Sequence, residues 1–91
     1  IMYAGRIVES GPVGAVLAAP RHPYTQGLIR SIPPMDDAPL TPIPGHPPVL
    51  SRRLPGCAFA PRCARAEPRC RDARPDFVSD GARGVACWSP L

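Results

Sequence analysis

The sequence predicts a small α+β fold that is mostly irregular, with an N-terminal β-hairpin, two short helices, a Pro-rich extended arm and a four-cysteine loop module. Three observations predict it. The 91 residues include 15 prolines and 8 glycines, a composition that limits regular secondary structure. All four cysteines lie in residues 57–91. A chain this short buries a modest core, so a staple such as a metal or disulfides is expected.

The first predicted segment is residues 1–11. Residues 2–9 indicate two short strands around Ala4-Gly5, because Gly supplies the positive φ of a tight turn and the following Ile-Val pair favours β structure. A lone hairpin is only marginally stable in water, so we expect it to complete a sheet whose other strands lie outside this chain. The opening residues have no basic region followed by a long apolar run, and we therefore expect a fragment of a larger protein, without a signal peptide.

Residues 12–32 are predicted to be a helical connector. One helix is expected over residues 13–19, where a proline then follows, and a second over residues 23–31. Pro23 occupies the first helical position, where proline is tolerated. The preceding His22 is expected to help set the start of this helix and not to act in catalysis.

Residues 33–56 are predicted to be an extended arm. Eight of their 24 residues are proline, which forbids a helix or a central strand. Such a segment is expected to lie as a strap over a neighbouring surface. Its apolar residues Ile43, Val49 and Leu50 would be the anchors.

Residues 57–91 are predicted to form a loop cage around sulfur. Cys57, Cys63, Cys70 and Cys87 are separated by 5, 6 and 16 residues, so no Cys-x-x-Cys pair typical of zinc sites exists. Iron–sulfur clusters accept more varied spacings. From the spacing alone, zinc and an iron–sulfur cluster are equally favoured, and disulfides or unrelated thiols remain open.

The apolar side chains near the cysteines suggest a water-excluding wall. We expect this wall to contain Phe59, Phe77, Val78, Val85 and Trp88. The same residues would equally serve as a small ordinary core.

The positive charge is confined to the cysteine-bearing half. Residues 1–51 carry three Arg and three acids, whereas residues 52–91 carry eight Arg and four acids, which accounts for the formal net charge of +4. Arginines beside a four-thiolate metal site would offset its negative charge. The aromatic residues are too few and scattered for a base-stacking platform, so no nucleic-acid partner is predicted.

Five ordered motifs carry a family resemblance that reaches the whole chain. The chain resembles the C-terminal region of ATPase subunits of dipeptide and oligopeptide ABC importers. The motifs are MYAGRIVE (residues 2–9), PRHPYTQGLI (20–29), IPGHPP (43–48), GCAFAPRC (56–63) and VAC (85–87).

The resemblance implies a fold and a function. The hairpin would be the end of a nucleotide-binding domain, and Cys57, Cys63, Cys70 and Cys87 would be the thiolate ligands of a 4Fe-4S cluster, with zinc as the alternative. ATP and Mg would bind only through an upstream domain, because the sequence contains no G-x-x-x-x-G-K-[ST] phosphate-binding loop. This fragment is therefore expected to be no enzyme, although the full-length subunit would be an ATP hydrolase.

The resemblance also implies a location and partners. The subunit would be cytoplasmic and peripheral on the inner face of the cell membrane. Its partners would be a second ATPase subunit and the membrane permease subunits, with no direct peptide contact. A structural role for the cysteine site is favoured over a regulatory one. The alternative function is an independent four-cysteine zinc or iron–sulfur module with a basic partner-binding face.

Overall fold

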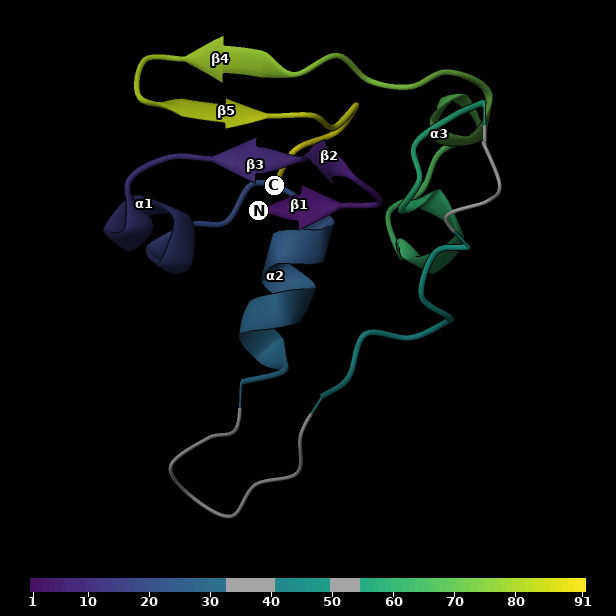
Figure 1. The fold of residues 1–91 in the computed structure, drawn as a ribbon, viewed down its shortest axis with the longest axis horizontal. Coiled ribbons are helices and arrows are strands. Elements are labelled where there is room, and N and C mark those ends of the chain that lie inside the picture. Colours follow the sequence, from purple (N-terminus) through teal and green to yellow (C-terminus); the bar gives the residue numbers. More distant parts are fainter. Residues whose placement is uncertain (33–40, 50–54) are drawn as a thin grey trace.

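The computed structural model describes residues 1–32, 41–49 and 55–91. Within them, the chain forms short helices and two small antiparallel sheets (Figure 1), which confirms the predicted α+β class. Helix α3 (Pro68–Asp72) lies on the right-hand side of this view, and the three-stranded sheet lies along the top. No helix among the described residues is long and apolar enough to cross a membrane.

The N-terminal hairpin is confirmed. Strands β1 (Met2–Tyr3) and β2 (Arg6–Ile7) pair antiparallel. Ala4 and Gly5 form the turn between them, with φ of 51° and 80°. Two consecutive residues with positive φ are what a tight two-residue hairpin requires, which explains the glycine.

The second sheet joins the two ends of the chain and was not predicted. It contains β3 (Glu9–Ser10), β4 (Val78–Asp80) and β5 (Arg83–Val85), in the order β3-β5-β4. The expectation that residues 57–91 consist of loops therefore missed a hairpin. Its strands have three residues each, too short for an alternating pattern to be recognised.

Both predicted helices are present, each ending one residue earlier than expected. They are α1 (Val13–Ala18) and α2 (Pro23–Arg30). The Nδ1 atom of His22 accepts a hydrogen bond from the amide of Tyr24 at 3.0 Å. This bond caps α2, as the sequence indicated, because it satisfies an amide that has no partner within the helix.

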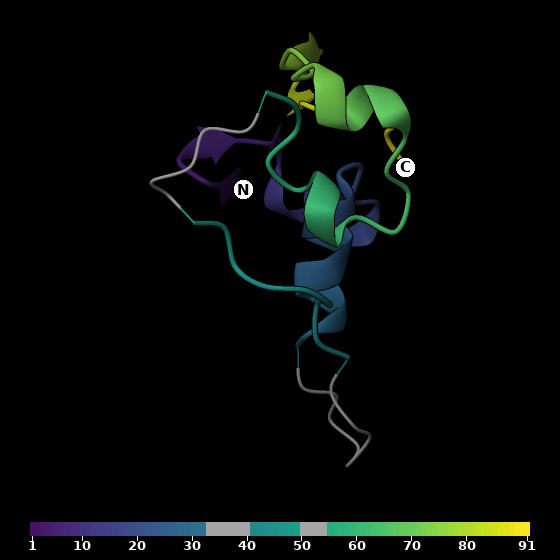
Figure 2. The same ribbon diagram turned by 90° about the vertical axis from the view of Figure 1, so that its right-hand side faces the viewer.

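The described parts of the predicted arm, residues 41–49 and 55–56, contain neither helix nor strand, and its residues 33–40 and 50–54 lie outside the described residues. The stretch 41–49 starts beside α2 and runs from there toward the N-terminal hairpin (Figure 2), with which it lines a common pocket. Ile43 packs against the core and over Gly27 of α2, so this anchor is confirmed. Val49 is 60% exposed and does not act as an anchor, and Leu50 lies outside the described residues.

The core is a small aromatic cluster between the hairpin, α2 and the cysteine-bearing half. Tyr3, Val8 and Phe59 form its centre. The Tyr3 ring lies edge-on to Phe59 and to Tyr24, with centroid distances of 5.2 Å and 4.6 Å. Edge-to-face contacts of this kind add to the stabilisation from apolar burial. Because Phe59 lies two residues after Cys57, this core also fixes one side of the cysteine site.

Candidate metal centre

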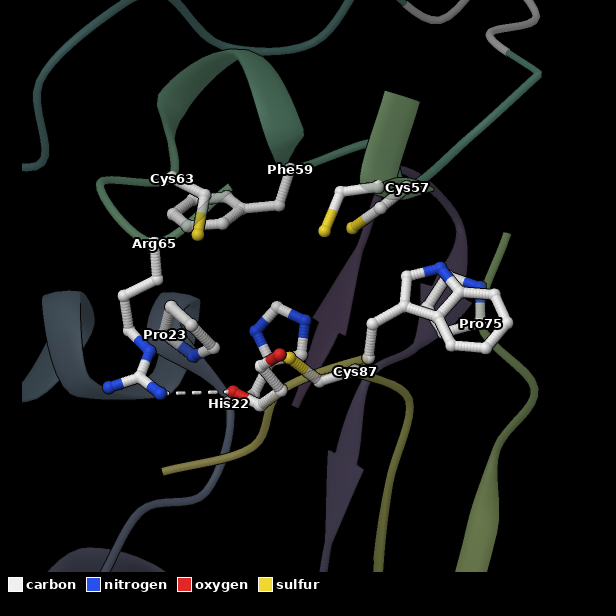
Figure 3. A pocket seen from close by; sticks show the side chains of 11 residues that line it. His22, Pro23, Cys57, Phe59, Cys63, Arg65, Pro75 and Cys87 are labelled. Carbon is white, nitrogen blue, oxygen red and sulfur yellow. Dashed lines mark hydrogen bonds between the residues drawn. The ribbon is translucent and has the colours of Figure 1, made fainter. Parts of the chain in front are cut away.

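The four cysteines, which come from separate parts of the chain, line a single pocket (Figure 3). Each is a half-buried free thiol. Cys57 and Cys63 flank the short 3-10 helix η1 (Ala60–Arg62), Cys70 lies in α3 (Pro68–Asp72), and Cys87 follows β5. The predicted site residues are therefore brought together by the fold, although up to 16 residues separate neighbours in the sequence.

A close backbone approach joins the first and third cysteines. The amide of Cys57 donates to the carbonyl of Cys70 at 2.6 Å. The neighbouring Gly56 is buried, and a Cβ atom there would overlap the Cys70 carbonyl and the Arg71 backbone. Glycine is therefore required at residue 56 because its backbone lies against α3, where a side chain would not fit.

Backbone amides contact the thiols, and burial acts on the pKa of two of them. The Glu67 amide donates to Sγ of Cys70 at 3.4 Å. Burial raises the pKa of Cys57, opposed by the amides of Phe59 and Ala60, and burial also raises the pKa of Cys87, opposed by the amide of Ser89. The other cysteines act on both of these thiols to raise the pKa further, because neighbouring thiolates repel each other.

The donor set suits a soft metal or a cluster. Four thiols with amide donors nearby are the ligands that zinc and iron–sulfur clusters use. In the described ranges, however, no three Cys, His, Asp or Glu side chains are gathered closely enough to hold one metal ion. The cysteines thus share a pocket without forming a compact shell around a single point.

The pocket wall agrees only partly with the predicted apolar shell. Phe59 and Trp88 line the pocket. Phe77 and Val78 are 42% and 63% exposed, and Val85 is buried in the sheet. The prediction was wrong for Phe77 and Val78, which do not line this pocket, because the chain there enters the unforeseen strand β4 (Val78–Asp80). Pro23 and Pro75 line the pocket and were not predicted.

Several arginines of the basic half hold segments of the chain together. Arg62 donates from Nε to the carbonyl of Pro44 at 3.0 Å. Arg69 pairs with Glu67 at 2.8 Å and lies over the ring of Trp88, 5.1 Å from its centroid. Arg65 lines the cysteine pocket, where its positive charge would stabilise thiolates.

A buried carboxylate supports the wall opposite the cysteines, and sequence analysis missed it. The side chain of Glu9 is fully buried and accepts hydrogen bonds from the amides of Arg21 and His22 at 2.9–3.1 Å. Arg83 donates to the same carboxylate at 3.1 Å. Glu9 therefore fixes the segment before α2 against the three-stranded sheet. Its place next to Val8 at the end of a predicted strand gave no sign of this role.

His22 is the second residue that the sequence did not place at the site. It is 1% exposed and lines the pocket together with the cysteines. Figure 3 shows its imidazole pointing into the space between the labelled sulfur atoms. Burial lowers the pKa of His22 to about 4, against the attraction of Glu9, so the ring is neutral near pH 7.

Comparison with known proteins identifies the family. Residues 8–70 match the family described as the oligopeptide/dipeptide transporter C-terminal region. This match includes three of the four pocket cysteines and the cap residue His22.

Curated relatives agree with this match. A putative peptide import ATP-binding protein of Brucella melitensis is 46% identical over 89 residues, covering 96% of this chain and 27% of that protein. Proteins of the same description from Brucella ovis and Brucella abortus are 52% identical over 87 residues, covering 87% of this chain and 26% of each relative. The chain thus spans about a quarter of the length of the curated relatives it matches. On these findings, the chain belongs to the oligopeptide/dipeptide transporter C-terminal region family.

Proposed function

We propose that this chain is the non-catalytic C-terminal extension of an ATP-binding subunit that powers dipeptide or oligopeptide import in an ABC transporter. The family match over residues 8–70 carries this proposal. The names of the relatives, which are peptide import ATP-binding proteins, support it. ATP and Mg would bind upstream of residue 1, and a second ATPase subunit and the permease subunits would be the partners at the inner face of the membrane.

The cysteine pocket is proposed to hold a 4Fe-4S cluster through Cys57, Cys63, Cys70 and Cys87. One observation of the structure supports this: all four thiols line one pocket. When bound, the cluster would supply four metal–thiolate cross-links and a one-electron redox centre.

The proposed role of this site is structural. The described hydrogen bonds that hold α3 and its two cap residues against the rest of the chain are few: one backbone bond from Cys57 to Cys70, and side-chain bonds that join Arg69, Glu67 and Ala73 to Trp88 and Ser89. Thiolate bonds to one cofactor would tie η1, α3 and the segment after β5 into one unit. In a domain this small, metal binding is expected to contribute directly to folding.

Metal analysis tests the cluster. The full-length subunit would be purified without oxygen and assayed for iron, acid-labile sulfide and zinc. We expect about four iron and four sulfide per chain, with broad visible absorption. One zinc without sulfide would replace the cluster by a zinc staple, and no metal would contradict the proposal altogether.

A substitution series tests the structural role. In Cys70→Ser, we expect loss of iron and faster hydrogen exchange in residues 57–72, with ATP hydrolysis retained by the upstream domain. Ala64→Ser is the matched control, because Ala64 is exposed and lies between Cys63 and Cys70. If oxidising the cluster in the unmodified protein changes the ATPase rate while residues 57–72 stay protected, the role is regulatory.

A further inference from the structure

The distal nitrogen of His22 is a buried polar atom with no hydrogen-bond partner. The side chain is 1% exposed, so water does not reach it from bulk solvent. An unpartnered buried polar group costs about 1–3 kcal/mol, and such groups are rare in native proteins. The distal nitrogen of His22 therefore indicates a hydrogen-bond partner within the pocket.

The hydrogen bond at the other ring nitrogen determines which nitrogen carries the proton. Nδ1 accepts from the amide of Tyr24 at 3.0 Å and so has a free lone pair. A neutral imidazole with an unprotonated Nδ1 has its hydrogen on Nε2. The atom without a partner is consequently a donor, and it requires an acceptor rather than a metal ion.

The surroundings of His22 limit what this acceptor can be. The imidazole lines the same pocket as the four cysteines and points into the space between their sulfur atoms (Figure 3). On its other side, the Phe59 ring packs against it at 5.8 Å between centroids. The carbonyl of Ala86 is close enough to attract the ring but does not meet hydrogen-bond geometry with Nε2.

We propose that His22 is a positioning residue that donates its Nε2–H to a sulfur atom of the cofactor held by the four cysteines, and thereby raises the reduction potential of that cofactor. This inference rests on the proposed cluster. Hydrogen bonds to the sulfur atoms of a cluster stabilise its more negative, reduced form. The same side chain caps α2 through Nδ1, so it links the start of α2 to the sulfur site.

Two substitutions separate the roles of the two ring nitrogens. In His22→Asn, the short amide can still cap α2 from the position of Nδ1, because Asn is a favoured N-cap residue, but it cannot reach the sulfur atoms. In His22→Gln, the longer amide can place an N–H near the position of Nε2 but caps poorly. A role limited to capping predicts that Asn is the better replacement by every measurement.

The experiment compares both variants with the unmodified full-length subunit, purified without oxygen. Iron and sulfide content is measured first, and then the midpoint potential is determined by titration with the reduced-state EPR signal as readout. In His22→Asn, we expect full iron content. We expect the equilibrium constant for reduction of its cluster to be roughly tenfold lower, which corresponds to a midpoint potential lower by about 59 mV for a one-electron couple. In His22→Gln, we expect a potential closer to that of the unmodified protein.

A spectroscopic measurement reports the contact directly. With ¹⁵N-labelled histidine, the reduced unmodified protein should show a weak nitrogen coupling to the cluster spin, and His22→Asn should lack it. If His22→Asn and the unmodified protein have the same iron content, the same midpoint potential and the same nitrogen coupling, the inference is overturned although the cluster is present. The partner of Nε2–H would then be the Ala86 carbonyl. Absence of iron and sulfide in the unmodified protein would overturn the inference together with the proposed function.

Discussion

The guanidinium of Arg83 lies 3.1 Å from the carboxylate of Glu9, a residue 74 positions earlier in the chain. The two residues belong to adjacent strands, β5 and β3. The same carboxylate holds the amides before α2, so one buried side chain connects the sheet, the helix start and His22 in the wall of the cysteine pocket.

Replacing Glu9 by Gln should strongly destabilise this region. The substitution removes the buried partner of Arg83 and places an amide group where backbone N–H donors converge, so we expect a loss of about 3 kcal/mol in the free energy of unfolding. Thermal unfolding and hydrogen exchange of residues 19–24 in the full-length subunit would measure it. Asp80→Asn, at an exposed residue of β4, is the control with little expected effect. Equal stability of the two variants would contradict a supporting role for Glu9.

Stability should fall in two steps as the pH decreases. Burial lowers the pKa of His22 from 6.5 to about 4, so the unfolded chain binds a proton before the folded chain does. The contribution of neutral His22 is therefore complete above pH 6.5 and is lost as the pH falls toward about 4. Burial acts to raise the pKa of Glu9, but its hydrogen-bond donors, led by the His22 amide, lower it below 4.5. The Glu9 contribution is present above pH 4.5 and is lost as the pH falls through its lowered pKa.

Unfolding midpoints measured from pH 7.5 down to well below pH 4 would check both steps. In His22→Asn, the step between pH 6.5 and about pH 4 should disappear, because the titrating ring is absent. A midpoint that rises as the pH is lowered from 7 to 5 would show that the sign is wrong.

Adding a methyl group at Gly56 should disrupt the cysteine site. The new Cβ atom would overlap the backbone of Cys70 and Arg71, which cannot move as freely as a side chain. We expect Gly56→Ala to cost about 1–3 kcal/mol and to reduce the iron content. Gly14→Ala is the matched control: Gly14 lies in α1 with open space around it, and alanine there should stabilise the helix by about 1 kcal/mol. Full iron content in Gly56→Ala would contradict the importance of this backbone contact.

Truncating Phe59 should damage the core and the site together. Its ring is 4% exposed and contacts Tyr3, Tyr24 and His22. We expect Phe59→Ala to cost about 3–5 kcal/mol, and Phe59→Leu considerably less because most of the volume is kept. Denaturant unfolding of the full-length subunit would give the difference, and Val13→Ala, at a residue 75% exposed, is a control for the loss of an apolar side chain. Similar losses in Phe59→Ala and Val13→Ala would remove Phe59 from the core.

The sequence alone determined the features that depend on local backbone geometry. Gly5 follows a turn residue between β-favouring segments, and this predicted the first hairpin. Pro23 after His22 predicted the start of α2, and the concentration of cysteines in residues 57–91 predicted one shared site, in keeping with the single pocket that all four line. Each of these features depends on allowed φ values, on the missing N–H of proline or on residue chemistry, all of which are properties of neighbouring residues.

Only the tertiary structure decided which distant segments meet. Nothing near Glu9 indicates that Arg83 will pair with it, and nothing near Phe77 indicates that a three-residue strand will leave it exposed. The position of His22 in the wall of the cysteine pocket likewise depends on the packing of His22 and Tyr24 against Phe59. The physical reason is that these contacts form between segments far apart in the chain. They form because the free energy gained from pairing and burial exceeds the entropic cost of closing a long loop. Neither of these two free energies can be read from a short stretch of sequence.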